Sequence, residues 1–222
     1  MTKIRTIHVG FVNEIEAKEV SLFRGAILHL LDKSQNLLYH NHETEGFRYR
    51  YPLIQYKRIQ KKASIMCLNE GADTIGLVLS RMNERIFLGK RPIHLELESV
   101  ESDSFDFKLS NNTVSYTIRD WLPLNQNNYE EYTKLEGLAE KSLFLERVLI
   151  GNMLSMAKGL DVFIDQQVNC NILDLSDLRW IYFKGVKVMS LDVVFKTNVV
   201  LPNYIGLGKG CSINHGTIVR IP

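Results

Sequence analysis

The order of hydrophobic patterns along the first hundred residues is the feature that most constrains the fold. Apolar and polar residues alternate over residues 6–11, which is the period-2 pattern of a strand with one buried face. Apolar residues then recur at helical spacing from residue 20. Asn13 followed by Glu16 has the spacing of a helix cap. We therefore expect a strand followed by a helix that ends near Asp32.

The pattern continues with two strands, a helix and a strand. Residues 53–59 and 63–69 are predicted to form a hairpin around the basic turn 60–62. A second helical stripe covers residues 75–86, and residues 92–100 supply a further strand. The order β-α-β-β-α-β is that of the ferredoxin-like unit, a four-stranded antiparallel sheet with both helices on one face.

The second half of the chain begins the same order again. A strand is predicted over residues 114–118 and a long helical region over residues 129–158. Residues 162–175, 178–183 and 188–197 have the composition of strands. No convincing second helix precedes the C-terminus.

The predicted fold class is therefore α+β, with two tandem ferredoxin-like (RRM-like, βαββαβ) domains. We place them at residues 1–101 and 102–222, the second being less regular. A chain of 222 residues is long enough for two domains, which commonly run to roughly 100–150 residues each.

Composition favours a soluble, cytoplasmic protein without a membrane partner. Hydrophobic residues make up 45% and charged residues 23% of the chain, and no apolar run approaches the roughly 18–20 residues that span a bilayer. Cys67, Cys170 and Cys211 lie far apart without CxxC spacing, so neither a disulfide framework nor a cysteine zinc site is expected. We predict no cofactor.

Positive charge is concentrated before and within the predicted hairpin. The net charge is only +2, but six cations and no acidic residue lie between residues 48 and 62: Arg48, Arg50, Lys57, Arg58, Lys61 and Lys62. Tyr49, Tyr51 and Tyr56 interleave with them. This mixture offers stacking surfaces beside phosphate contacts, as in RNA-binding sheets. The alternative is a solvated hairpin face.

A glycine-rich segment lies near the C-terminus, at residues 202–216. Gly206, Gly208 and Gly210 alternate, with Lys209 and Ser212 among them. A P-loop or a dinucleotide fingerprint would have to open a helix, whereas the residues after Gly210 have the pattern of a strand, so both are excluded. Glycines can take positive φ and bring backbone N–H groups close to an anion. A glycine-rich turn between strands is the alternative.

Residues 39–50 read YHNHETEGFRYR, and His40 and His42 can have several meanings. In an extended segment both side chains point to the same side. An HxH pair can supply two zinc ligands, but a third is required and no paired spacing indicates one. In HNH nucleases the three residues of the name are spread through a ββα-metal fold, so the adjacent letters HNH at residues 40–42 are weak support for that class. Exposed loop histidines are the remaining interpretation.

The chain resembles the CRISPR-associated repeat-RNA endoribonucleases, the sixth Cas family, which cut precursor CRISPR RNA into units. Residues 203–216, NYIGLGKGCSINHG, are similar to the C-terminal glycine-rich signature of that family. The segment YHNHETEGFRYRYPLIQYKRI is similar to the region where its members keep a catalytic histidine. The spacing of HxH and a tyrosine seven residues later resembles one archaeal subgroup.

The resemblance implies metal-independent cleavage, in which a ribose 2′-hydroxyl attacks the adjacent phosphate and leaves a 2′,3′-cyclic phosphate and a 5′-hydroxyl. Two imidazoles with a pKa near 6.5 suit the roles of base and acid. We expect His40, His42 and Tyr49 to be catalytic. The expected RNA-binding residues are Arg48, Arg50, Lys57, Arg58, Lys61, Gly206, Gly208, Lys209, Gly210, Ser212 and His215.

Three functions remain open at this point. The first is an endoribonuclease that binds a CRISPR repeat and cuts it. The second is a non-catalytic RNA-binding protein of the same fold, and the third is a structural subunit of a CRISPR effector complex with other Cas proteins as partners. Cleavage separates the first from the others, and co-purification with Cas subunits separates the third.

Overall fold

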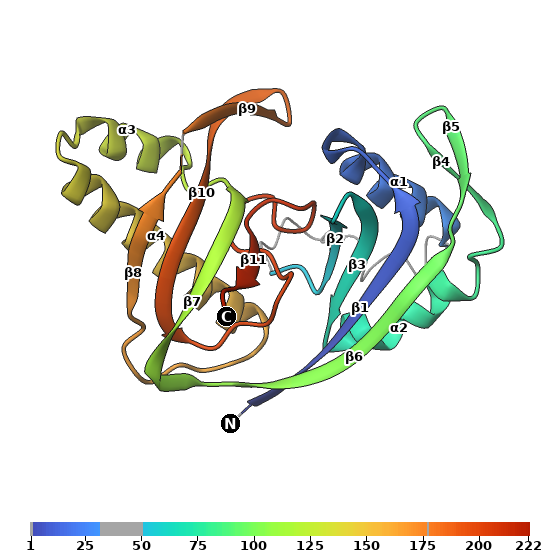
Figure 1. The fold of residues 1–222 in the computed structure, drawn as a ribbon, viewed down its shortest axis with the longest axis horizontal. Coiled ribbons are helices and arrows are strands. Elements are labelled where there is room, and N and C mark those ends of the chain that lie inside the picture. Colours follow the sequence, from blue (N-terminus) through green and yellow to red (C-terminus); the bar gives the residue numbers. More distant parts are fainter. Residues whose placement is uncertain (1, 32–50, 177) are drawn as a thin grey trace, which may run out of the picture. The chain divides into compact units, whose positions relative to one another are not determined.

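The computed structural model of the protein describes residues 2–31, 51–176 and 178–222. These residues form two compact units (Figure 1). The N-terminal unit consists of Lys3–Phe105 together with Ser212–Asn214, and the C-terminal unit consists chiefly of Asp106–Cys211 and His215–Pro222. Among the described residues, no helix is both long and apolar enough to cross a membrane.

The N-terminal unit is a four-stranded sheet in the order β2-β3-β1-β6. Its elements are β1 (Thr2–Glu14), a 3-10 turn η1 (Ala17–Glu19), α1 (Val20–Leu30), β2 (Ile54–Ile59), β3 (Lys62–Leu68), α2 (Glu70–Leu79) and β6 (Leu97–Phe107). A small hairpin of β4 (Arg85–Leu88) and β5 (Arg91–His94) precedes β6. If β1, β2, β3 and β6 are numbered 1 to 4, the sheet read from β6 has the order 4-1-3-2, which is that of a ferredoxin-like unit.

Both helices of this unit bury their apolar faces against one side of the sheet. Val20, Phe23 and Ile27 of α1 and Ile75 and Val78 of α2 belong to one buried cluster with residues of β1, β2 and β3. The ring of Phe23 packs edge-on against Phe11 and against Tyr56, with ring centroids 5.9 Å apart in each pair. Such aromatic pairs add specific geometry to the area that they bury.

The predicted β2–β3 hairpin is confirmed, and its turn has a defined geometry. The strands pair antiparallel from Ile54 with Cys67 to Ile59 with Lys62. The two residues between them, Gln60 and Lys61, have φ of 49° and 70°. Positive φ at both central residues is the mark of a type I′ turn, whose twist matches that of the flanking strands.

Two local predictions in this half are wrong. Asn13 does not cap α1, because its side chain donates to the backbone carbonyl of His94 and accepts from the backbone N–H of Glu96. The 3-10 turn η1 that leads into α1 is instead capped by a box in which the Glu19 side chain accepts from the backbone N–H of Glu16. The second helix also ends at Leu79, so Ile86 lies in β4.

The C-terminal unit repeats the strand order of the first. Its elements are β7 (Leu109–Trp121), α3 (Gln126–Lys134), α4 (Leu138–Gly159), β8 (Cys170–Leu175), β9 (Arg179–Phe183), β10 (Val186–Val199) and β11 (Thr217–Arg220). The sheet order is β11-β7-β10-β8, with β9 paired to β10. The prediction of an α+β fold with two tandem ferredoxin-like domains, the second less regular, is confirmed.

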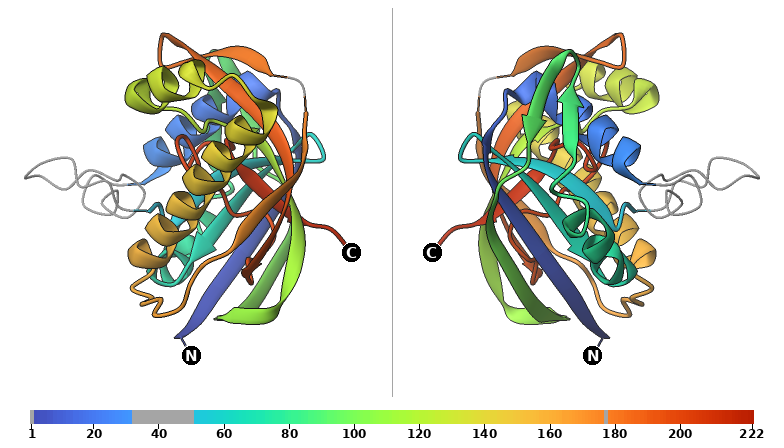
Figure 2. Two further views of the ribbon diagram at one scale, coloured as in Figure 1. Left: turned by 90° about the vertical axis from the view of Figure 1, so that its left-hand side faces the viewer. Right: turned by 90° about the vertical axis from the view of Figure 1, so that its right-hand side faces the viewer.

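The C-terminal unit departs from the ideal pattern in its helices. The region predicted as one helix is broken at residues 135–137 into α3 and α4, and the strand predicted from residue 162 begins only at Cys170. Helix α4 packs against the sheet through Phe144, Leu149 and Met153 (Figure 2). Residues 200–216, where the second helix of a ferredoxin-like unit would lie, contain no helix and hold the glycine-rich segment instead.

Candidate functional site

The glycine-rich segment is held in a conformation that needs glycine at three positions. Gly208, Gly210 and Gly216 have φ of 79°, 75° and 61°, in the left-handed region that side chains with a Cβ atom disfavour. Gly206 differs, because it is buried and forms an isolated antiparallel bridge with Thr217. The segment is therefore folded tightly back along the start of β11.

Gly208 lets the segment approach a buried polar pair. A Cβ atom at this position would overlap the side-chain oxygen of Asn152, and it would lie 3.1 Å from Nε1 of Trp121. Trp121 is fully buried at the end of β7, and its Nε1 donates to Asn152 Oδ1 at 3.0 Å. The polar edge of a buried tryptophan is thus satisfied by α4, and the glycine backbone closes over the pair.

Gly210 and Lys209 lie against the aromatic ring of Phe183. A Cβ atom at Gly210 would be 2.9 Å from both Phe183 and His215. The His215 ring packs edge-on against Phe183 with centroids 5.3 Å apart, and its Nδ1 lies 3.2 Å from the backbone oxygen of Asp120. Lys209 is exposed, with its ammonium nitrogen 5.3 Å from the Phe183 ring centroid. The exposed ammonium group of Lys209 therefore lies between two glycines, where no side chain covers the backbone.

The tip of the glycine-rich segment, Ser212–Asn214, belongs to the N-terminal unit and lines the edge of β2. The backbone N–H of Tyr56 donates to the carbonyl oxygen of Ser212 at 2.8 Å, and the N–H of Arg58 donates to Asn214 Oδ1 at 3.0 Å. Ile213 forms a parallel bridge with Tyr56 and packs against the N-terminal core. The structure thus brings Ser212 and Arg58, two predicted RNA-binding residues, to the same strand edge.

The predicted basic residues on β2 and its turn differ in accessibility. Arg58 is partly buried, and its Nε donates to the backbone oxygen of Ile15 at 2.6 Å. Lys61 is exposed at the type I′ turn, and Lys62 forms an ion pair with Glu98. Lys57 is fully buried, with an exposed fraction of 0%. Lys57 is therefore not exposed at the surface in this structure, and its role in RNA binding stays a prediction.

The remaining predicted site residues fall within residues 40–50. His40, His42, Arg48, Tyr49 and Arg50 lie outside the residues that the structure describes. Their roles stay predictions that follow from the sequence and from the resemblance.

Elsewhere in the described part of the chain, two cysteines and His8 lie in buried surroundings that shift their pKa values. Burial raises the pKa of the Cys67 and Cys170 thiols to about 12, so neither is a reactive thiolate near neutral pH. His8 on β1 lies 3.7 Å from a carboxylate oxygen of Glu101 on β6. Burial lowers the pKa of His8, and Glu101 opposes this shift. Across residues 2–31, 51–176 and 178–222, no group of three or more His, Cys, Asp or Glu side chains is arranged to hold a metal ion.

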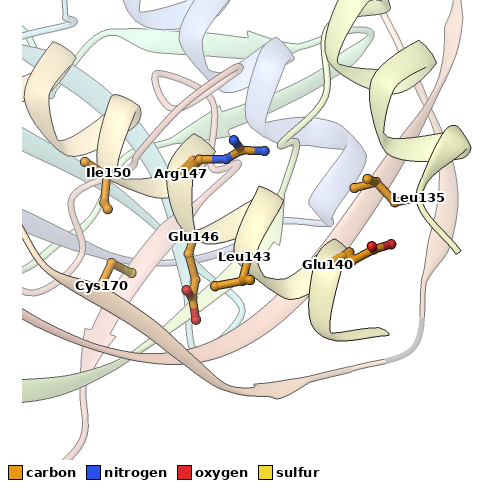
Figure 3. A pocket seen from close by; sticks show the side chains of 7 residues that line it. All are labelled: Leu135, Glu140, Leu143, Glu146, Arg147, Ile150 and Cys170. Atoms are coloured by element: carbon orange, nitrogen blue, oxygen red, sulfur yellow. The ribbon is translucent and has the colours of Figure 1, made fainter. Parts of the chain in front are cut away.

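A separate cavity of about 460 Å³ lies beside α4 (Figure 3). It is lined by Leu135, Glu140, Leu143, Glu146, Arg147, Ile150 and Cys170. Glu146 accepts a hydrogen bond from the backbone N–H of Ile172 at 2.7 Å, which ties the cavity wall to β8. None of the predicted site residues that the structure describes lines this cavity.

Comparison with known proteins decides the family. Residues 2–106 match the model of the Cas6b N-terminal domain, and residues 108–221 match that of the Cas6b C-terminal domain. The chain belongs to the Cas6b family. This family comprises CRISPR RNA-processing endoribonucleases, so the predicted resemblance to the repeat-RNA endoribonucleases is confirmed.

Solved structures and a curated relative agree with this membership. A crystal structure of Cas6b covers 99% of this chain and 100% of its own, with 25% identity and a TM-score of 0.89. A second, described as the CRISPR RNA processing endoribonuclease Cas6b, has the same coverage and identity with a TM-score of 0.75. An uncharacterized protein of Methanocaldococcus jannaschii, MJ0978, is 34% identical over 117 residues, which are 52% of this chain and 78% of that protein.

Sequence reasoning missed three residues that shape this site. Gly216 was not singled out, although its left-handed φ and its approach to Leu207 make it as demanding as Gly208. Asn152 carries no local signal, because its partner Trp121 is 31 residues away. Asn214 is also in the left-handed region, with φ of 75°, and an asparagine next to a glycine-rich run was the available hint.

Proposed function

We propose that this member of the Cas6b family is a metal-independent endoribonuclease that cleaves CRISPR repeat RNA. The ribose 2′-oxygen attacks the adjacent phosphorus, the bond to the 5′-oxygen of the next nucleotide breaks, and the products carry a 2′,3′-cyclic phosphate and a 5′-hydroxyl. The observation that carries the proposal is that both halves of the chain match Cas6b domain models. The paired histidines provide groups that suit this chemistry.

In this proposal, His40 is the general base and His42 is the general acid. The base removes the proton of the 2′-hydroxyl while the acid donates a proton to the departing 5′-oxygen, so that no free alkoxide forms. Tyr49 orients the 2′-hydroxyl or the phosphate. Lys57 or Arg58 neutralises the negative charge that grows on the non-bridging oxygens in the transition state.

The described residues supply the proposed RNA contacts outside the reacting group. Lys209 is exposed beside Gly208 and Gly210, where the absence of side chains allows a phosphate to reach backbone N–H groups. Ser212 and His215 are partly exposed in the same segment. On the N-terminal unit, Lys61 is exposed at the β2–β3 turn and Arg58 lies near Ser212.

We also propose a division of labour between two domains. The N-terminal domain, residues 1–101, carries the catalytic histidines, and the C-terminal domain, residues 102–222, carries the glycine-rich RNA-binding segment. Gly206 acts within this segment as a structural glycine, because it bridges to Thr217.

The test is cleavage of the cognate repeat RNA by single histidine variants. His40→Ala and His42→Ala are each expected to lower the single-turnover rate by about 10²–10⁴-fold, with RNA affinity within a few-fold of wild type. His94→Ala is the matched control, because His94 is exposed on the β4–β5 hairpin. Full cleavage by both His40→Ala and His42→Ala would refute the assignment.

The same assay separates the alternative functions. Tight binding of repeat RNA by the wild-type protein without any cut would indicate a non-catalytic RNA-binding protein. Cutting or binding that requires other Cas proteins would indicate a subunit of an effector complex. Each outcome is distinct from the loss of activity in one histidine variant.

A further inference from the structure

The hairpin of β9 and the first part of β10 exposes large aromatic side chains. Trp180 and Tyr182 on β9 have exposed fractions of 46% and 79%. The two-residue turn of Lys184 and Gly185, with φ of 50° and 80°, closes the hairpin tightly. In Figure 1, β9 extends beyond the rest of its own sheet. Aromatic rings of this size are normally buried, so their exposure on a paired hairpin indicates a contact surface.

The strand register places these rings on one face with a lysine. Tyr182 pairs with Lys187, and Trp180 pairs with Met189, and directly paired residues share a face of an antiparallel sheet. The ammonium nitrogen of Lys187 lies 5.6 Å from the Trp180 ring centroid. Tyr129 of α3 packs edge-on against Trp180 with centroids 6.0 Å apart. We call Tyr129, Trp180, Tyr182 and Lys187 the aromatic face.

The opposite face of the same hairpin touches the glycine-rich segment. Phe183 follows Tyr182 along the strand and so points to the other side. Its ring receives Lys209 and His215 from the glycine-rich segment and Lys184 from the hairpin turn, with the two lysine nitrogens at 5.3 and 5.8 Å from the ring centroid. Both faces lie within the C-terminal unit. An RNA strand held at Lys209 is therefore next to the hairpin.

Charge indicates which kind of partner fits the aromatic face. Residues 179–187, RWIYFKGVK, contain three cations and no acidic residue. Arg179 is neutralised by ion pairs with Asp120 and Asp192, at 3.1 and 2.5 Å. Lys187 is then the cation beside Trp180, and Lys184 lies beside Phe183 on the opposite face. Exposed rings beside lysines suit single-stranded nucleic acid, whose bases stack while its phosphates meet the cations.

We propose that Trp180 and Tyr182 form a base-stacking platform for unpaired nucleotides of the RNA that the glycine-rich segment holds. This inference rests on the proposed function, because it names a binding site for the same RNA. Two bases stack on the platform and add affinity whatever their identity, because every base has a face that can stack. Its contribution is non-electrostatic, in contrast to that of Lys209.

The test compares affinities of the full-length protein for labelled single-stranded repeat RNA. Trp180→Ala and Tyr182→Ala are each expected to weaken binding by roughly 5- to 150-fold, without changing the slope of affinity against salt. Phe163→Ala is the matched control, because Phe163 has an exposed fraction of 88% and lies between α4 and β8. Trp180→Phe keeps a stacking ring and is expected to restore most of the affinity, which distinguishes lost stacking from misfolding.

Tryptophan fluorescence gives a second readout. The chain has two tryptophans, Trp121 and Trp180, and Trp121 is fully buried. Quenching by bound RNA should therefore come from Trp180 and disappear in Trp180→Phe.

The outcomes separate this inference from the proposed function. If the wild-type protein cuts repeat RNA while both alanine variants bind it as tightly as wild type, the platform is refuted and the function stands. If the wild-type protein neither binds nor cuts repeat RNA, both proposals are refuted. Alanine variants that bind RNA normally but no longer assemble with another Cas protein would show that the aromatic face is a protein interface, and this would also refute the platform.

Discussion

Replacing Gly216 by alanine is expected to destabilise the C-terminal unit by about 2–3 kcal/mol. Gly216 has φ of 61°, and an alanine in the left-handed region costs roughly 1–2 kcal/mol. Its Cβ atom would also overlap the backbone oxygen of Leu207, and rotating a side chain cannot relieve this overlap. The backbone must shift, which breaks the hydrogen bond from Leu207 N–H to Gly216 O, 2.9 Å long, at a cost of about 1 kcal/mol.

The assay is urea unfolding followed by tryptophan fluorescence. Trp121 and Trp180 both lie in the C-terminal unit, so their emission reports the unit that contains Gly216. Gly151→Ala is the matched control, because Gly151 is in α4 and no heavy atom lies within 4 Å of its added Cβ. Alanine should stabilise that helix by about 0.5–1 kcal/mol. Equal stability of the two variants would refute the argument that the segment requires glycine.

Two further predictions concern charge. Acidification should destabilise the N-terminal unit through His8, because burial lowers its pKa below the ordinary value of 6.5 while Glu101 partly opposes that shift. The unfolded chain then binds the proton more readily, so the free energy of unfolding falls as pH drops through 6.5 towards the folded-state pKa. In urea titrations at several pH values, His8→Gln should flatten this part of the curve; equal curves for wild type and His8→Gln would contradict it. Lys209→Gln should reduce the slope of log affinity for repeat RNA against log salt concentration by about 0.7, as measured by titration in several KCl concentrations, whereas an unchanged slope would exclude a phosphate contact at Lys209.

The regular elements were predictable where one face of an element is buried, because burial imposes a period of 2 or 3.6 on the apolar residues. The apolar period does not show where a helix ends or is interrupted. Ile86 continues the apolar stripe of α2 although the helix ends at Leu79, and the break between α3 and α4 at residues 135–137 falls within a polar-apolar pattern that a single helix would also show. Asn13 failed as a cap because its partners lie more than 80 residues away.

The candidate site was predictable only in its local chemistry. The absence of a Cβ atom permits the positive φ that Gly208 and Gly210 adopt. The burial of Lys57 could not be inferred, because a basic residue in a short hairpin is usually solvated. The exposure of Trp180 and Tyr182 could not be inferred either, because a strand rich in aromatic residues has the composition of a buried strand.

The most direct test of the central claim uses the chemistry of the cut itself. End-labelled cognate repeat RNA is incubated with the purified protein in EDTA, beside the same RNA carrying one 2′-deoxy nucleotide at the cut site. The account predicts that the all-ribose RNA is cut to a 2′,3′-cyclic phosphate and a 5′-hydroxyl, and that the 2′-deoxy RNA stays intact. Cleavage of the 2′-deoxy RNA, or loss of all cleavage in EDTA, would contradict internal attack by the 2′-hydroxyl without a metal ion.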